Sequence, residues 1–282
     1  MAKPRIRFKQ LPTRQRVRKA LLFVSLMLLP VTLYYFSPIL ILAGASEGVI
    51  TGSFLVFALQ FVSALVVGRA WCGWVCPAGA LQEFAAPIND ARMPRRRADW
   101  IKWAIWLPWV GLIAGLALAA GGLRRVDPFF QLPGGVTLAI PTDEGGPPWY
   151  VIYYLIVALF VGLAVVFGRR AGCHTICWMA PFMILGRKLR NRVGWPALQL
   201  EAGAGRCTDC MKCTLDCPMS LDVNAMVRAG DMEDAECILC ATCADTCPHD
   251  VIHMTFGGRK LAPARVTEPA EAVAASGGVR AS

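Results

Sequence analysis

The sequence predicts an all-α transmembrane domain of four spans followed by a small α+β domain. Hydrophobic residues make up 56% of the 282 residues and charged residues only 17%, a balance too apolar for an ordinary soluble protein. Four apolar segments of transmembrane length lie in the first part of the chain. The last part contains two cysteine runs of identical spacing, and a chain of this length has room for about two domains.

The chain begins with a basic segment, residues 1–19, in which eight Lys or Arg residues occur without an acidic one. The apolar segment that follows is too long for a signal-peptide core and predicts a retained span, which Pro30 and Pro38 are expected to kink or end. The predicted transmembrane domain covers residues 20–192. Its four spans are residues 20–43, 49–68, 100–120 and 149–167.

Polar and small residues within these segments have ordinary explanations. Lys102, at the edge of the third span, can reach the interface with its long side chain. Gln60 is expected to make an interhelical hydrogen bond, and Gly111 and Gly115 form a GxxxG pattern typical of close helix packing. Residues 178–186 are apolar but too short to span, which predicts an interfacial or re-entrant segment.

The distribution of basic residues predicts the topology and argues against nucleic acid as a partner. The net charge is +10, but Lys and Arg gather beside the apolar segments, where topology and anionic lipid explain them. The positive-inside rule places both termini in the cytoplasm, together with all twelve cysteines, and disulfides are rare in that compartment. Aromatic residues interleaved with basic ones, typical of single-strand binders, are missing.

The cysteine-rich region, residues 200–256, contains C-x2-C-x2-C-x3-C-P twice, ending at Pro218 and at Pro248. This spacing is typical of bacterial-type 2[4Fe–4S] ferredoxins, in which the fourth cysteine of each run binds the other cluster. One cluster is therefore assigned to Cys207, Cys210, Cys213 and Cys247, and the second to Cys237, Cys240, Cys243 and Cys217. Zinc is disfavoured because its sites use separated C-x2-C pairs. Outside this region, the composition of residues 121–148, between the third and fourth spans, predicts an irregular loop, and that of residues 257–282 predicts a disordered tail.

The other four cysteines form an internal repeat within the membrane domain. Gly68-Arg69 precedes Cys72-x3-Cys76, and Gly168-Arg169 precedes Cys173-x3-Cys177, each after a pair of predicted spans. A parallel repeat would bring the two pairs together at the cytoplasmic ends of the spans. The four thiols could bind a metal or a third cluster, act as a redox-active dithiol, or be structural.

Several neighbours of these four cysteines are candidates for a supporting role. Glu83 and His174 are the titratable residues closest to the pairs and are candidate proton acceptors, although an interfacial histidine is often merely solvated. Trp71, Trp74 and Trp178 flank the pairs and are interpreted as interfacial anchors.

The combination of four spans, two Cys-x3-Cys motifs and a C-terminal two-cluster ferredoxin resembles the NapH/MauN-type membrane-bound polyferredoxins, and more distantly the NosR and CcoG membrane ferredoxins. The first motif follows the family's Cys-x3-Cys-Pro pattern with Cys76-Pro77, whereas the second departs from it, with Pro181 displaced. The resemblance implies a multi-pass protein of the bacterial inner (cytoplasmic) membrane that exchanges electrons with the quinone/quinol pool. It also implies functional roles for Cys72, Cys76, Cys173 and Cys177.

The sequence therefore predicts an electron carrier rather than a stand-alone enzyme, with quinol oxidation as a possible activity. It would relay electrons between a membrane donor and a respiratory or periplasmic redox system, such as nitrate reduction or methylamine oxidation. The alternative is a maturation factor that supplies electrons for assembly or activation of a periplasmic metalloenzyme. Another redox protein is expected as a partner, and acidic residues of the ferredoxin region could bind a basic one. These residues are Asp209, Asp216, Asp222, Asp231, Glu233, Asp234, Glu236 and Asp245.

Overall fold

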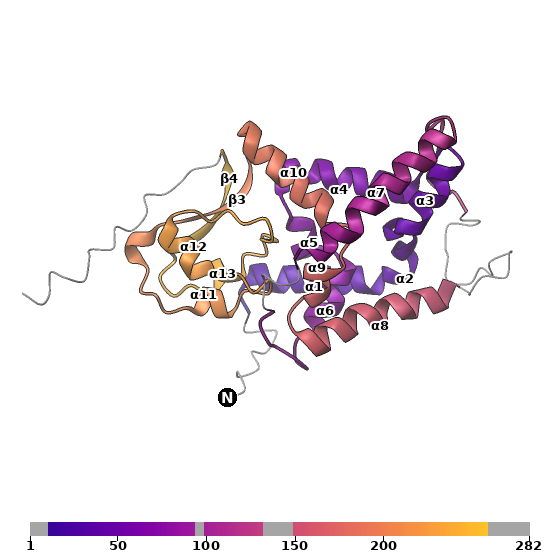
Figure 1. Ribbon diagram of the computed structural model, residues 1–282. Coiled ribbons are helices and arrows are strands. Elements are labelled where there is room, and N and C mark those ends of the chain that lie inside the picture. Colours follow the sequence, from indigo (N-terminus) through magenta and orange to yellow (C-terminus); the bar gives the residue numbers. More distant parts are fainter. Residues whose placement is uncertain (1–10, 94–98, 132–148, 259–282) are drawn as a thin grey trace, which may run out of the picture.

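The computed structural model describes residues 11–93, 99–131 and 149–258, and a larger helical region and a smaller cysteine-rich module lie side by side in it (Figure 1). The helical region runs from α1 to α10, and the module contains two strands and three short helices. In chain order the helical region consists of α1 (Thr13–Met27), α2 (Leu29–Thr32), η2 (Leu33–Phe36), α3 (Pro38–Ser46), β1 (Val49–Thr51), α4 (Gly52–Val67), α5 (Ala70–Trp74), α6 (Pro77–Ala85), α7 (Ile101–Ala119), β2 (Arg125–Asp127), α8 (Trp149–Phe167), α9 (Ala171–Thr175) and α10 (Ala180–Val193).

Among the described residues, two helices are long and apolar enough to cross a membrane, rather than the four predicted. They are α7 and α8. The predicted first span is bent by 61° between α1 and the α2–η2 segment, and it would count as a third span only if both pieces crossed together. Pro30 lies in the first turn of α2, where its missing N–H and its ring disfavour a continuous helix. The predicted second span shortens to α4, which has 16 residues.

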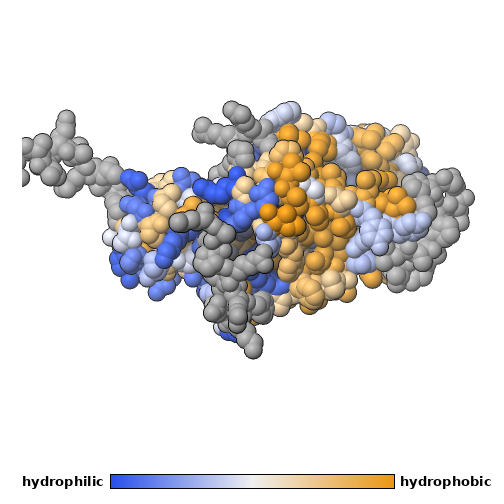
Figure 2. Space-filling view, turned by 90° about the horizontal axis from the view of Figure 1, so that it is seen from below, coloured by the Kyte–Doolittle hydropathy of each residue, from blue (hydrophilic) through white to orange (hydrophobic). Residues whose placement is uncertain are grey.

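The surface divides in the same way as the fold. Figure 2 shows a hydrophobic surface over the helical region and a mainly hydrophilic surface over the cysteine-rich module. Both α7 and α8 expose large apolar side chains, including Leu107, Leu118, Leu155 and Val166. Such an apolar surface is expected where lipid is the solvent.

The helical region is not purely helical, which corrects the predicted all-α class. Strand β1 pairs in parallel with β2, from Val49 opposite Arg125 to Thr51 opposite Asp127. Strand β1 directly precedes α4, and β2 lies in the segment after α7 that the Gly/Pro-rich composition predicted to be irregular. Residues 132–148 of that loop, like the predicted tail from 259 onward, lie outside the described residues.

The predicted internal repeat has a structural counterpart. In both units a long helix (α4, α8) leads to a five-residue helix (α5, α9) with cysteine at its third position, and then to a further helix (α6, α10). The turns are closed by equivalent hydrogen bonds, since the Cys76 amide donates to Trp71 O at 3.0 Å and the Cys177 amide to Gly172 O at 3.1 Å. The units differ where the sequence departs from the family pattern: α6 starts at Pro77, whereas α10 starts at Ala180, with its proline at the next position.

Residues 178–186, predicted to be interfacial or re-entrant, are largely packed against protein. Helix α10 packs along α4, where Gly186 leaves no room for a side chain: a Cβ there would lie 2.7 Å from Phe61 O and 2.9 Å from Ala64 Cβ. Lipid is therefore not the neighbour of this face of α10.

The cysteine-rich module is built on an antiparallel pair of strands. The pair extends beyond the predicted boundaries, from Ala197 opposite Gly257 to Ala202 opposite Ile252. Between the strands lie the two cysteine loops and the short helices. The elements are β3 (Ala197–Ala202), η5 (Ala204–Arg206), α11 (Lys212–Leu215), α12 (Val223–Ala229), α13 (Thr242–Asp245) and β4 (Ile252–Gly257).

Candidate metal centres

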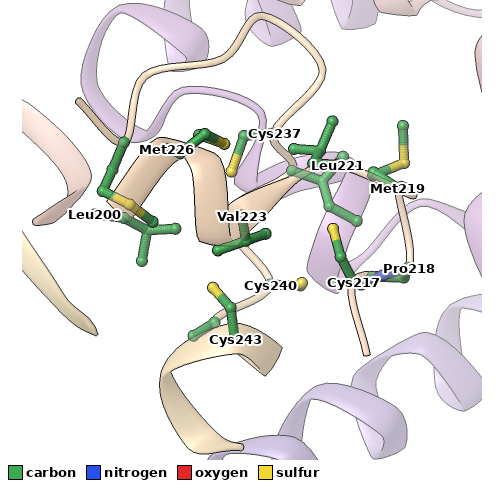
Figure 3. A pocket seen from close by; sticks show the side chains of 13 residues that line it. Leu200, Cys217, Pro218, Met219, Leu221, Val223, Met226, Cys237, Cys240 and Cys243 are labelled. Carbon is green, nitrogen blue, oxygen red and sulfur yellow. The ribbon is translucent and has the colours of Figure 1, made fainter. Parts of the chain in front are cut away.

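The module's eight cysteines line two separate cavities. One cavity, of about 380 Å³ including space open to solvent, is lined by Cys217, Cys237, Cys240 and Cys243, whose side chains surround it (Figure 3). The other, of about 330 Å³ measured in the same way, is lined by Cys207, Cys210, Cys213 and Cys247. The fourth cysteine of each run thus lies with the first three of the other run, which is the arrangement that the spacing predicts for two [4Fe–4S] clusters.

The two cysteine runs share an unusual backbone. Positive φ angles, which non-glycine residues rarely adopt, occur at equivalent positions: Asp209 and Leu239 before the second cysteine, and Met211 and Ala241 after it. Ser220 and Asp250, three residues after each fourth cysteine, also have positive φ. This conformation costs free energy in a non-glycine residue, and its repetition is consistent with two loops folded around groups of the same shape.

The two cavities differ in their exposure to solvent. Cys217, Cys237, Cys240 and Cys243 are all buried, and we call them the inner set. We call Cys207, Cys210, Cys213 and Cys247 the outer set; its Cys210 is exposed, and Cys207 and Cys247 are partly exposed. The inner set is adjacent to the helical region, because Gln15 of α1 donates to Cys240 O at 2.9 Å and a Cβ at Gly73 would lie 3.5 Å from Cys240 Cα.

The repeat brings Cys72, Cys76, Cys173 and Cys177 together, and we call them the membrane set. All four are buried. Burial, followed by the nearby thiols of Cys72, Cys177 and Cys173, raises the pKa of Cys76 well above its ordinary value. Burial and then Cys173 and Cys72 raise the pKa of Cys177 to about 12. The four sulfurs are therefore close enough for their charges to interact.

Polar groups are arranged around the membrane set so that they can hold thiolates. The Gly79 amide bonds to Cys76, and the Met179 and Ala180 amides bond to Cys177, at the start of α6 and of α10. The side-chain amide of Gln82 donates to Cys173 Sγ at 3.2 Å. N–H donors at helix N-termini are suited to stabilise negatively charged sulfur.

Two carboxylates, the partly buried Glu83 and the buried Glu236, flank the membrane set, and each is held by two cations. Glu83 accepts from Arg18 at 3.0 Å and from Arg170 at 2.6 Å. Although burial alone would raise it, these two cations lower the pKa of Glu83 to about 2. Arg170 also donates to Cys72 O at 2.8 Å. Glu83 therefore stays ionised at neutral pH, and the structure does not support the proton-acceptor role considered for it from the sequence.

The second carboxylate, Glu236, directly precedes Cys237 of the inner set. It accepts from Arg69 at 2.9 Å and from Lys102 at 2.6 Å. Lys102 is only 1% exposed, so it does not extend to an interface as the sequence predicted. The group of Glu83 with Arg18 and Arg170 carries a net positive charge, which is favourable beside clustered thiolates.

His174 is buried instead of solvated. Its Nδ1 lies 3.0 Å from Asp99 Oδ1, and its Nε2 has no hydrogen-bond partner among the described residues. His174, Asp99 and Glu236 are close enough together to bind a cation. The Lys102 ammonium, 2.6 Å from Glu236 and 3.9 Å from Asp99, already supplies a positive charge to both carboxylates.

Many residues that the sequence assigned to membrane topology or to a soluble partner instead join the two regions. Arg187 binds Glu233 at 2.5 Å, and Arg190 donates to Gly257 O at 2.8 Å. With Glu236 and with Asp245, which accepts from Gln15 at 2.6 Å, three of the acidic residues expected to attract a basic partner are bound by this chain's own helical region.

Trp74, Trp178 and Gln60 have internal partners, whereas the buried indole N–H of Trp71 has no hydrogen-bond partner among the described residues. The Trp74 indole donates to Leu239 O at 3.0 Å and the Trp178 indole to Phe36 O at 3.0 Å, so neither is simply an interfacial anchor. Gln60 contacts the Met179 thioether at 3.5 Å, between α4 and the start of α10. By contrast, Gly111 and Gly115 have no described neighbour within 4 Å, so the GxxxG pattern makes no helix contact there.

Comparison with known proteins identifies two regions of the chain. A 4Fe-4S dicluster domain matches residues 206–252, which contain the inner and outer sets. A 4Fe-4S binding domain matches residues 49–97, which contain Cys72 and Cys76. No solved structure matches the chain.

Three curated relatives extend the similarity to most of the chain. Protein RdxA of Cereibacter sphaeroides is 29% identical over 77% of this chain and 45% of its own length, and the regulatory protein NosR of Pseudomonas aeruginosa is 29% identical over 69% of this chain and 27% of its own. The methylamine utilization ferredoxin-type protein MauN of Methylorubrum extorquens is 27% identical over 73% of this chain and 68% of its own length. The resemblance to MauN-type and NosR-like membrane ferredoxins is confirmed. This chain spans less than half the length of RdxA and NosR.

Proposed function

We propose that this protein is a membrane-anchored iron–sulfur electron carrier with three centres. The observation that carries the proposal is the crossed arrangement of the inner and outer cysteine sets around two cavities. Bound [4Fe–4S] clusters would supply one-electron transfer at both sets. The chain contributes the thiolates, the loop backbone that presents them, and the protein surroundings that set the potentials.

The membrane set is proposed to hold the third centre, a [4Fe–4S] cluster. Four buried sulfurs converge there from two equivalent turns, with N–H donors aimed at three of them. The match of residues 49–97 to a 4Fe-4S binding domain supports a cluster over a mononuclear metal. The competing explanation is a redox-active dithiol without metal, because closely spaced buried cysteines can also exchange electrons as thiols.

The proposed setting is a bacterial inner membrane, with the cysteine-rich module and both termini in the cytoplasm. Helices α7 and α8 would span the bilayer, and the bent α1–η2 segment and α4 would complete a four-span domain. The quinone/quinol pool is the proposed membrane partner and another redox protein the proposed second partner. A respiratory or periplasmic system such as nitrate reduction or methylamine oxidation would receive the electrons, in keeping with the similarity to MauN.

The second candidate function is maturation of a periplasmic metalloenzyme; among the relatives, NosR is named as a regulatory protein and not as an electron carrier. A deletion strain distinguishes the two. A partner enzyme that is complete and active with an artificial donor but starved of electrons in cells would support the carrier. A partner enzyme that accumulates without its metal would support maturation.

The proposal is tested by counting iron and acid-labile sulfide in protein purified anaerobically in detergent. We expect about twelve iron atoms per chain, falling to about eight when Cys72 and Cys173 are both changed to Ser. A count of about eight in the parent, unchanged in that variant, would remove the third centre. Zinc without sulfide would refute the electron-transfer function.

A further inference from the structure

We propose that electrons pass between the inner set and the membrane set across one specific contact, the seam between residues 72–74 and residues 238–240, while the outer set exchanges electrons with a soluble partner. This inference rests on the proposed function and assigns an order to its three centres. One electron leaves one centre, which is oxidised, and enters the next, which is reduced; no bond forms or breaks.

The seam brings the two turns into backbone contact. Gly73, directly after Cys72, has no side chain, and a Cβ there would overlap Ile238 O and lie 3.5 Å from Cys240 Cα. The next residue, Trp74, donates from its indole to Leu239 O at 3.0 Å. Cys72 of the membrane set is thus followed directly by Gly73, and Gly73 contacts the segment that contains Cys240 of the inner set. Electron tunnelling falls steeply with distance, so this backbone contact and this hydrogen bond provide a short connection between the two sets.

Side chains of helix α1 form hydrogen bonds to both sides of the same seam. Gln15 donates to Cys240 O at 2.9 Å and to Asp245 at 2.6 Å, so it holds the inner loop. One turn later, Arg18 donates to Gly73 O at 3.1 Å and also binds Glu83. Gln15 and Arg18 are 4% and 2% exposed, and Arg18 donates to Gln15 Oε1 at 2.8 Å. Gln15 and Arg18, which are buried and hydrogen-bonded to each other, therefore each donate to one backbone carbonyl, on opposite sides of the seam.

The outer set is more exposed to solvent than the inner set, and we therefore assign it to the soluble partner. The inner set is buried on all four cysteines, whereas the outer set includes the exposed Cys210. Met211, beside it, is 38% exposed, and the outer cavity is lined in part by Thr208 and His249. A partner that docks over Cys210 would approach the outer set directly, but it would reach the inner set only through it.

The test uses Gly73→Ala and Trp74→Phe in the full-length protein. Gly73→Ala forces the turns apart because its Cβ would strike backbone, whereas Trp74→Phe keeps an aromatic ring and removes only the donor to Leu239 O. Gly203→Ala is the matched control, since a Cβ at Gly203 meets nothing within 4 Å. The readouts are the iron count and the magnetic broadening of the paramagnetic resonance spectrum, which reports how closely neighbouring reduced centres interact.

We expect all three variants to keep about twelve iron atoms. The Cys72→Ser, Cys173→Ser double variant should lose the broadening that the membrane set causes. Gly73→Ala and Trp74→Phe should lose the same part of the broadening, whereas Gly203→Ala should keep it. Unchanged broadening in both seam variants, with the iron count intact, would overturn the seam alone. A count of about eight in the parent would overturn the third centre and the route with it, so the two failures are distinguishable. If Gly73→Ala loses iron, the broadening in Trp74→Phe alone tests the seam: reduced broadening would support it and unchanged broadening would overturn it.

Discussion

At the scale of single residues, the most informative feature is the set of charges buried around the membrane set. Arg18, Arg69, Lys102 and Arg170 are all at most 2% exposed, and each binds Glu83 or Glu236. A buried ion pair adds little net stability over an apolar pair, but removing one partner leaves an uncompensated charge in a low-dielectric interior. These residues are therefore expected to be intolerant of single substitutions.

Glu83→Gln is expected to destabilise the protein by about 3 kcal/mol, because Arg18 and Arg170 would remain buried without their carboxylate. Chemical denaturation in detergent measures the effect. Asp127→Asn is the control, since it breaks the more exposed Arg125–Asp127 pair, which should contribute less than about 1 kcal/mol. Equal effects of the two substitutions would contradict this account of Glu83.

The same pair predicts a pH dependence. The pKa of Glu83 is lowered from 4.5 to about 2, so its stabilisation is complete above about pH 4.5 and is lost as the pH falls toward 2. The difference in stability between the parent and Glu83→Gln should therefore narrow as the pH is lowered from about 5 to about 3. Comparing parent and variant at each pH cancels acid damage common to both. A difference that widens on acidification would show that Glu83 is not held ionised.

At the scale of elements, the sequence predicted the repeat better than it predicted the spans. The repeat was readable because Gly-Arg and Cys-x3-Cys recur in the same order, and α4–α5–α6 and α8–α9–α10 reproduce it. The spans were harder to predict, because an apolar segment can be surrounded either by lipid or by protein and hydropathy does not distinguish the two. Composition predicted an interfacial or re-entrant segment at residues 178–186, but it could not predict that α10 packs against α4.

The contact between α4 and α10 gives a prediction for Gly186. Gly186→Leu should destabilise the helical region by about 1–3 kcal/mol, because the new side chain would meet the Phe61 carbonyl and the Ala64 side chain. The melting temperature in detergent measures the loss. Gly111→Ala on α7, where nothing lies within 4 Å, should leave that temperature unchanged or raise it. A neutral Gly186→Leu would place α10 away from α4.

At the scale of the whole molecule, the net charge of +10 is partly explained by docking between the two regions. Basic side chains of the helical region bind carboxylates and carbonyls of the cysteine-rich module, including Arg69 to Glu236 and Arg187 to Glu233. The cysteine sets could be predicted from spacing alone, since cluster geometry dictates it. These docking pairs could not, because the partners are distant in sequence and a charge count does not say which charges will meet.

The proposed topology predicts where each end of the chain lies. A fluorescent protein fused after Ser282 should fluoresce in the cytoplasm, because the C-terminus is proposed to stay on that side. Alkaline phosphatase inserted after residue 140 should be active, because that loop is proposed to lie in the periplasm. The opposite pattern would invert the orientation and place the cysteine sets in the periplasm.

The central claim, that the chain carries three one-electron centres, is tested most directly by an anaerobic coulometric titration of the purified protein. We predict an uptake of about three electrons per chain, decreasing to about two in the Cys72→Ser, Cys173→Ser double variant. An uptake of about two in both proteins would limit the electron carriers to the inner and outer sets. No reversible uptake at all would contradict the account.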